Sequence, residues 1–142
     1  MPPTGGRDRA LKVPRRHIEE MVEHARADAP NECCGLIGGT PDEAQSIHRA
    51  ENAEASPFRY SIAPREQLEL MNRIEDDGEQ VAGIYHSHTR TPAYPSQTDI
   101  NLAAGWPDAV YFIVSLEHPE KPDVKAFRIN GSAVDDVDLQ IS

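Results

Sequence analysis

The stretch VAGIYHSHTRTPAYPSQTD, residues 81–99, predicts a strand, a stiff loop and the first turn of a helix in immediate succession. Its Val, Ile and Tyr residues favour a strand over 81–88. Side chains two residues apart on a strand point to the same face, so His86 and His88 project together, roughly 7 Å apart along the strand. Two imidazoles at that spacing can bind one metal ion, but two histidines on the solvent face of a strand are also common. The pair alone is therefore a weak signal.

The loop and helix that follow supply a third candidate ligand, Asp99. The seven residues 89–95 include two prolines, and a loop of this length allows Asp99 to return to the histidines. Two histidines, one carboxylate and one open position form a pattern of catalytic zinc. The competing interpretation is structural, because the segment from Ser96 to Asp99 also matches a capping box with Ser96 as the N-cap. The two interpretations are compatible, since a helix N-terminus holds its side chains in fixed positions.

The rest of the chain predicts a single α+β domain in which strands and helices mingle without a strict βαβ repeat. Apolar residues at helical spacing predict one helix between Pro14 and Pro30 and another over 64–76, whose apolar face is expected to include Leu68. A third, short helix is expected over 97–105. Strands are predicted from apolar runs, from alternation of apolar and polar residues, or from an adjacent Asn-Gly turn, over 32–39, 45–52, 58–62, 81–88, 109–115, 124–129 and 133–139.

Length, composition and charge restrict the class of protein. A chain of 142 residues with 38% hydrophobic and 27% charged residues has the size and composition of one globular domain. The net charge of −10 argues against nucleic acid or an anionic membrane as a partner. No stretch approaches the ~20 apolar residues that span a bilayer, and the polar start has no signal-peptide pattern, which predicts a cytoplasmic protein. Residues 1–10 are expected to form a flexible leader.

Three side chains near the first predicted strand bear on the chemistry. Cys33 and Cys34 adjoin each other, so we expect small buried hydrophobic residues rather than a disulfide. Glu32 precedes them at the start of an apolar, glycine-rich strand. An unpaired carboxylate is costly to bury, and the local sequence alone favours a glutamate kept in solvent at the strand end. The alternative is a general base that accepts a proton from water beside a metal ion.

The pattern of these residues resembles that of a known family, the JAMM/MPN+ zinc metalloproteases. The family motif E…H-S/T-H-x7-S-x2-D is matched at every defined position, by Glu32, His86, Ser87, His88, Ser96 and Asp99. The segment PNECCG, residues 30–35, is also similar to the P-x-E-x-C-G opening of the bacterial and archaeal members. The order of predicted elements is similar over residues 12–130.

The resemblance implies a fold and a set of roles. The fold is a curved mixed β-sheet flanked by helices, the MPN or JAB domain with its cytidine-deaminase-like arrangement, and residues 11–142 form the catalytic domain. Zn2+, one ion per chain, is then held by His86, His88 and Asp99. Glu32 acts as general base and then as proton donor to the leaving amine, and Ser96 hydrogen-bonds the developing oxyanion. The other histidines match nothing in the motif and are expected to be surface or structural residues: His17, His24, His48 and His118.

The resemblance also implies an activity. The family hydrolyses amide or isopeptide bonds at the C-terminus of ubiquitin-like proteins. This short chain looks most like the members that release cysteine from a ubiquitin-like sulfur-carrier protein, so a zinc metallopeptidase of cysteine biosynthesis with such a carrier as partner is expected. The alternatives are an isopeptidase that removes a ubiquitin-like modifier from lysine and, less favoured, a non-catalytic MPN scaffold. A zinc deaminase is disfavoured because the combination of H-x-E with P-C-x-x-C is absent. The sequence predicts no particular oligomeric state.

Overall fold

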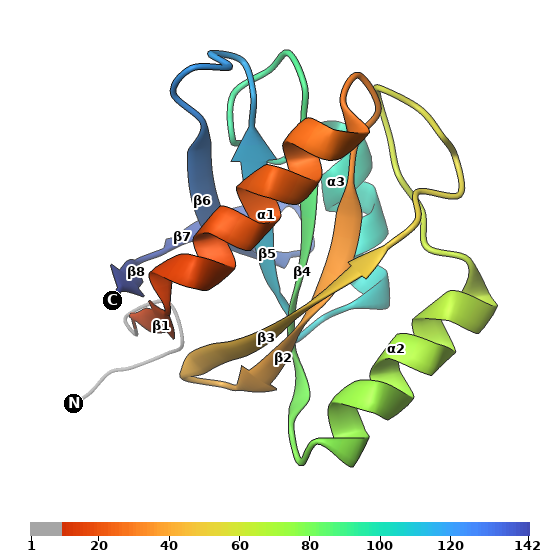
Figure 1. Ribbon diagram of the computed structural model, residues 1–142, viewed down its shortest axis with the longest axis vertical. Helices are drawn as coiled ribbons and strands as arrows, with labels where there is room; N and C mark the ends of the chain where they lie inside the picture. The colour runs from red at the N-terminus through yellow and green to blue at the C-terminus, as the bar shows by residue number, and fades with distance from the viewer. Residues whose placement is uncertain (1–9) are drawn as a thin grey trace.

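One curved sheet with helices packed on both of its faces makes up the structure, a computed structural model that describes residues 10–142 (Figure 1). The strands are β1 (Leu11–Val13), β2 (Cys34–Thr40), β3 (Glu43–Ala50), β4 (Gln80–His88), β5 (Val110–Ser115), β6 (Asp123–Asn130), β7 (Ala133–Val137) and β8 (Leu139–Ile141). The helices are α1 (Arg15–Asp28), α2 (Pro64–Asp76), α3 (Gln97–Leu102) and the short 3-10 helix η2 (Ala103–Gly105). The predicted α+β fold is confirmed.

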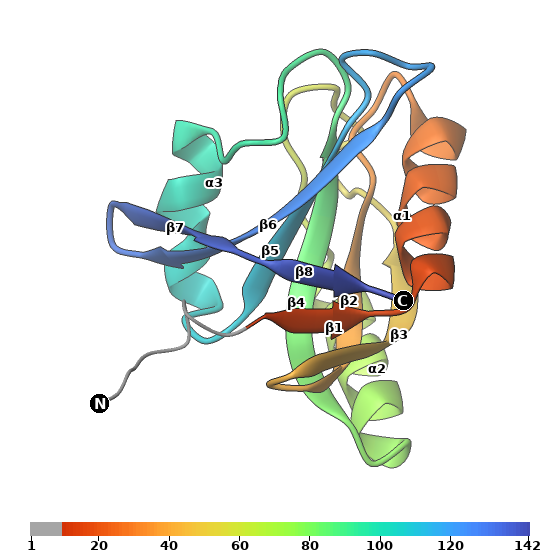
Figure 2. The ribbon, with the colours of Figure 1, turned by 90° about the vertical axis from the view of Figure 1, so that its left-hand side faces the viewer.

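The order of strands across the sheet is β7-β6-β5-β4-β2-β3-β1-β8. β4 pairs in parallel with β5, and β1 pairs in parallel with both β3 and β8, whereas the other neighbours are antiparallel, so the sheet is mixed as expected. β7 runs almost directly into β8 along the chain, although the two lie at opposite ends of the strand order. This connection requires a strongly curled sheet, as Figure 2 shows.

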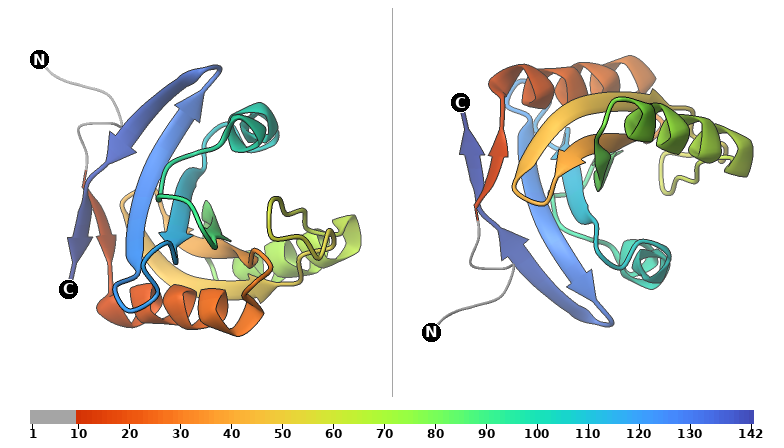
Figure 3. Two further views of the ribbon diagram at one scale, coloured as in Figure 1. Left: turned by 90° about the horizontal axis from the view of Figure 1, so that it is seen from above. Right: turned by 90° about the horizontal axis from the view of Figure 1, so that it is seen from below.

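Each face of the central strands has its own apolar core. One core joins α1 to the sheet and includes Met21, Tyr85 and Phe112. The other joins α2 and η2 to the opposite face and includes Leu36 and Leu70. Figure 3 shows α1 on one side of the sheet and α2 and α3 on the other. We call these two sides of the sheet the α1 face and the α2/α3 face. The buried side chains of β4 point toward one or the other.

Strand β4 lies between β2 and β5 in the middle of the sheet, and its alternation assigns each side chain to a face. Tyr85 belongs to the α1 core, whereas His86 contacts Asp99 of α3 on the other side. The sheet is tight at this point. Any side chain at Gly35 of β2 would overlap the Tyr85 ring and the carbonyl oxygen of His48 on β3. Gly35 is therefore required for the close packing of β2 against the strand that carries the two histidines.

The strand predicted over 58–62 is wrong. These residues lie in the connection 51–63 between β3 and α2, which has no regular secondary structure. Their alternation of apolar and polar residues reflects packing rather than pairing, because Tyr60 and Ile62 lie against the α2/α3 core. Phe58, which the strand pattern would place on the same face, is 77% exposed.

Two smaller expectations change as well, and one short strand was not predicted. Leu68 is exposed, because the buried face of α2 is formed by Leu70 and Ile74, four residues apart. The strand predicted over 133–139 is two strands, β7 and β8, and β1 is too short to leave a periodic signal.

Of the predicted leader, residues 1–9 lie outside the described residues, so the division of the chain at residue 10 stays a prediction. Within the described part, no helix has the length and apolar character needed to cross a membrane.

Candidate metal centre

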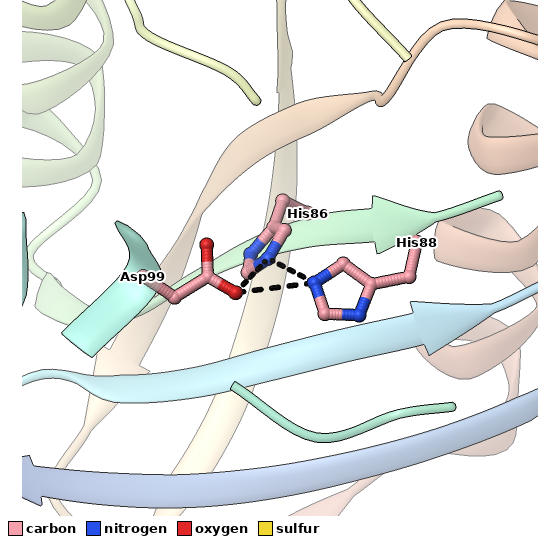
Figure 4. A group of neighbouring side chains, drawn as sticks. All are labelled: His86, His88 and Asp99. Carbon is pink, nitrogen blue, oxygen red and sulfur yellow. Dashed lines mark hydrogen bonds and ion pairs between the residues drawn. The ribbon is translucent and has the colours of Figure 1, made fainter. Parts of the chain in front are cut away.

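Three buried side chains meet on the α2/α3 face of β4 (Figure 4). His86 and His88 come from the end of β4, and Asp99 comes from the first turn of α3. The two Nε2 atoms lie 3.2 Å apart. Each of them lies 3.1 Å from Oδ2 of Asp99. The structure thus brings together the three residues that the sequence proposes as ligands, with one donor atom from each at the corner of a small triangle.

The size of this triangle suits a tetrahedral metal ion. Ligand atoms that lie about 2.0–2.1 Å from zinc are separated from one another by about 3.3 Å at tetrahedral angles. The observed separations of 3.1 and 3.2 Å are close to that value. Three protein donors leave one tetrahedral position for water or substrate, as in catalytic zinc sites. The group of three side chains could therefore hold a divalent metal ion without rearrangement.

A hydrogen bond at Nδ1 of His88 determines that Nε2 of the same ring faces the triangle. Nδ1 of His88 lies 2.9 Å from the carbonyl oxygen of Pro92. Because a carbonyl oxygen only accepts hydrogen bonds, Nδ1 must carry the proton, and the neutral ring then presents an unprotonated Nε2 to the centre. Pro92 belongs to the loop that leads to Asp99, so this loop both delivers the carboxylate and orients a histidine. Metal-ligating histidines are usually oriented in this way.

Helix capping holds the carboxylate in place. The backbone N–H of Ser96 donates to Oδ2 of Asp99 at 2.9 Å, and Oγ of Ser96 accepts from the backbone N–H of Asp99 at 3.1 Å, so the predicted capping box is confirmed. Burial alone would raise the pKa of Asp99, but hydrogen bonds and charge that His86 and His88 supply in their protonated forms outweigh it and hold this pKa well below its ordinary value. The capping group and the candidate ligand are thus one ionised carboxylate.

Glu32 faces the same centre from the segment that leads into the neighbouring strand β2. Cys34 pairs with His86 in the antiparallel register of β2 and β4, which places Glu32, two residues earlier, opposite His88 on the same face. Glu32 is only 4% exposed, and its Oε1 has no hydrogen-bond partner in residues 10–142. Desolvation raises its pKa to about 8, although the charge of His88 acts in the opposite direction. The interpretation of Glu32 as a solvated strand-end residue is therefore wrong.

Ser96 occupies a more open position than the residues around it. Its Oγ accepts the capping hydrogen bond from Asp99, and its side chain lies at the exposed start of α3. A serine hydroxyl that accepts through one lone pair keeps its proton available for a second partner. Ser96 can therefore donate a hydrogen bond to a group bound beside Asp99.

Comparison with known proteins identifies the family. The model of the prokaryotic homologs of the JAB domain matches residues 14–130 of this chain. The chain belongs to the prokaryotic JAB family. The resemblance inferred from the motif is thereby confirmed, and the match covers both candidate histidines, Asp99, Ser96 and Glu32.

Relatives of this JAB domain include named peptidases. The CysO-cysteine peptidase of Mycobacterium tuberculosis is 42% identical over 120 residues, which cover 82% of this chain and 81% of that protein. The desampylase of Haloferax volcanii is 35% identical over 104 residues, which cover 68% and 74% of the two chains. Among solved structures, a protein from Desulfitobacterium hafniense is similar with a TM-score of 0.85 and 37% identity, over 93% of this chain and 92% of that one.

The connection 51–63 of this JAB domain contains a buried asparagine that sequence reasoning missed. The Asn52 amide nitrogen donates to the carbonyl oxygens of Glu32 and Arg59, each at 3.0 Å. Its Oδ1 accepts from the backbone N–H of Glu54 at 2.9 Å and of Ser61 at 3.3 Å. The bond to the residue two positions later is an Asx turn, which an asparagine after a strand can signal in a sequence. The other three bonds depend on the folded path of the chain.

An aromatic ring from the same connection covers one of the histidines. The rings of Tyr60 and His86 are stacked, with centroids 4.6 Å apart and an interplanar angle of 23°. The two residues are far apart in sequence, and no pattern in the sequence links them. Tyr60 is therefore a residue of the site that only the fold reveals.

Proposed function

We propose that this JAB domain is a zinc-dependent peptidase that hydrolyses the amide bond at the C-terminus of a ubiquitin-like sulfur-carrier protein and releases cysteine. The observation that carries the proposal is the triangle of two Nε2 atoms and one Oδ2 atom at 3.1 to 3.2 Å beside the buried Glu32. The CysO-cysteine peptidase relative, which is 42% identical over 82% of this chain, supports the substrate class.

Each ligand has a role that its surroundings support. His86, His88 and Asp99 would hold one zinc ion per chain, with the histidines presenting Nε2 to it. A zinc ion at such a site would lower the pKa of a bound water molecule to about 7 and polarise the scissile carbonyl group. Positive charge here also stabilises the ionised form of Glu32, whose pKa desolvation raises to about 8. The carboxylate needed as a base is then available near neutral pH.

Glu32 transfers the proton of the reaction. It accepts a proton from the attacking water as the new C–O bond forms, and it returns a proton to the amide nitrogen as the C–N bond breaks. The products are the carboxylic acid of the carrier, which ionises at neutral pH, and the free amine, so one water is consumed and Glu32 is regenerated. Ser96 donates its hydroxyl proton in a hydrogen bond to the oxyanion that develops at the carbonyl.

A second candidate within the same chemistry is an isopeptidase that removes a ubiquitin-like modifier from lysine. The desampylase relative, 35% identical over 68% of this chain, favours this activity. The two activities share every catalytic group and differ only in the leaving amine, which is cysteine in one case and a lysine side chain in the other.

Mass spectrometry of two substrates distinguishes these candidates. A carrier with cysteine in amide linkage at its C-terminus and a carrier joined to a lysine side chain are each incubated with the zinc-loaded protein. We expect the cysteine adduct to yield free carrier and cysteine, and a chelator to stop the reaction. Faster cleavage of the lysine conjugate would favour the isopeptidase. An intact adduct and an intact conjugate would contradict both candidates and favour a scaffold.

A further inference from the structure

The two histidines of the metal centre differ in how their rings are held. His88 donates from Nδ1 to the carbonyl oxygen of Pro92 at 2.9 Å. His86 is buried, and its Nδ1 has no hydrogen-bond partner in the described part of the chain. Metal-ligating histidines almost always use this second nitrogen for a hydrogen bond that sets the ring orientation. The His86 ring therefore needs another source of orientation.

Tyr60 provides a contact of the right geometry. Its ring is stacked on His86 with a centroid distance of 4.6 Å and an angle of 23°, and His88 contacts the His86 ring edge-on at 5.0 Å and 64°. The lone pair of Nε2 lies in the plane of the imidazole. A flat surface packed against one side of that ring therefore restricts the direction in which Nε2 points.

The backbone around Tyr60 is fixed on both sides. The carbonyl oxygen of Arg59 accepts from the Asn52 amide at 3.0 Å, and the N–H of Ser61 donates to Asn52 Oδ1 at 3.3 Å. The Tyr60 ring itself packs against the α2/α3 core. Because the same Asn52 amide also donates to the carbonyl of Glu32, one side chain holds the backbone of both the base and the stacking residue.

We infer that Tyr60 is a positioning residue whose ring sets the plane of His86 and thereby the affinity of the centre for its metal ion. The inference rests on the proposed function, because it requires His86 to be a ligand. Tyr60 acts through His86 and needs no contact with the substrate. The aromatic face is the required feature, so phenylalanine fulfils the role and an aliphatic side chain does not.

Zinc affinity measured on metal-free protein tests the inference without relying on activity. The dissociation constant is obtained by competition with a chromophoric chelator for the native protein, Tyr60→Phe, Tyr60→Leu and the control Ile62→Ala. Ile62 lies in the same connection and packs against the same core, but it does not stack on a histidine. We expect Tyr60→Phe and Ile62→Ala to bind zinc like the native protein and Tyr60→Leu to bind about tenfold more weakly.

Absorption of bound cobalt(II) gives a second readout, because its visible spectrum reports the geometry of the ligands. The Tyr60→Leu spectrum should differ from the native spectrum, whereas the Tyr60→Phe spectrum should match it. If Tyr60→Leu does not fold, Tyr60→Met supplies the same comparison. Native affinity and spectrum in the folded aliphatic variant, or an equal loss in Ile62→Ala, would overturn the inference and leave the proposed function intact. A native protein that binds no zinc would overturn the proposed function as well.

Discussion

The two faces of strand β4 are both buried, yet their polar groups are treated differently. On the α1 face, the hydroxyl of Tyr85 lies 2.7 Å from Nδ1 of His24, and Oγ of Ser87 accepts from the backbone N–H of Cys33 at 2.8 Å. On the α2/α3 face, Nδ1 of His86 and Oε1 of Glu32 have no hydrogen-bond partner in residues 10–142. Side chains at alternate positions of β4 thus meet polar groups that have hydrogen-bond partners on one face and two polar atoms that lack them on the other.

This difference indicates which face of β4 stabilises the fold and which face carries the candidate site. A buried polar group without a partner costs about 1–3 kcal/mol, so a sheet selected only for stability would not retain two of them at one place on one face. Buried polar networks that the protein itself completes rigidify a fold. The α1 face therefore holds β4 in place, whereas the α2/α3 face carries the donor atoms of the proposed metal centre and the carboxyl group proposed as its base.

The largest effect is expected from Glu32→Gln. The amide cannot accept and return a proton, so turnover of the carrier–cysteine adduct should fall about 100-fold to 10,000-fold. Zinc content and thermal stability should stay at native levels, because glutamine is nearly isosteric and removes a carboxyl group that is costly to ionise. Turnover and metal content are measured on the same preparation. The control is Glu79→Gln, which removes a carboxylate outside the metal centre. In the native protein the hydroxyl of Ser46 donates to Oε1 of Glu79 at 2.6 Å. Full activity of Glu32→Gln would show that another group is the base.

A smaller loss, now of metal affinity, is expected from Asp99→Asn. Asparagine still caps α3, because its side-chain oxygen accepts from the backbone as the carboxylate does, but it lacks the negative charge. We expect zinc affinity to fall about tenfold or more while the helix content is unchanged. Asp28→Asn is the matched control, since Asp28 lies 3.3 Å from His24 on the α1 face. Equal zinc affinities in the two variants would remove the distinction between the faces.

Ser87→Ala is expected to have the opposite effect to Asp99→Asn, because it should lower the stability of the fold and leave the zinc affinity unchanged. The substitution leaves the buried N–H of Cys33 without its acceptor, which should lower the free energy of unfolding by about 1–3 kcal/mol. Urea denaturation of the metal-free protein measures this loss, and chelator competition should give native zinc affinity. A Ser87→Ala protein of native stability and weakened zinc affinity would show that the two faces are not independent.

The smallest effect concerns acid stability on the α1 face. Desolvation lowers the pKa of His24 from its ordinary value of 6.5, although the nearby Asp28 acts in the opposite direction. Below pH 6.5 the unfolded chain binds a proton at His24 before the folded chain does, so the free energy of unfolding must fall as the pH decreases. Urea denaturation at about pH 7.5 and about pH 5.5 should show a smaller fall for His24→Gln than for the native protein. An equal fall would assign the acid sensitivity to other groups.

The features of the site that depend on residues close together in the sequence could be predicted from it. The strand period placed His86 and His88 on one face, and the capping box placed Asp99 at the start of α3. The family motif added Glu32 and Ser96, although the local sequence alone favoured a solvated Glu32. Its burial depends on the register between β2 and β4, which joins residues about fifty positions apart.

Other features could not be predicted because they arise from long-range packing. Tyr60 reaches His86 only through the path of the connection 51–63, and its alternation with Ile62 resembled that of a strand. Strand β1 has three residues, too few for a periodic pattern. His24 was expected to be a surface or structural residue, and it is structural, since it is buried and lies beside Tyr85. Its partner could not be named without the fold.

Anomalous X-ray diffraction at the zinc absorption edge, from crystals grown with zinc, tests the central claim most directly. We predict one peak per chain at about 2.0–2.1 Å from Nε2 of His86 and of His88 and from a carboxylate oxygen of Asp99, with Glu32 beside the open fourth position. A structure with no peak between these three side chains, or with the zinc bound elsewhere and Glu32 turned away from it, would contradict the account.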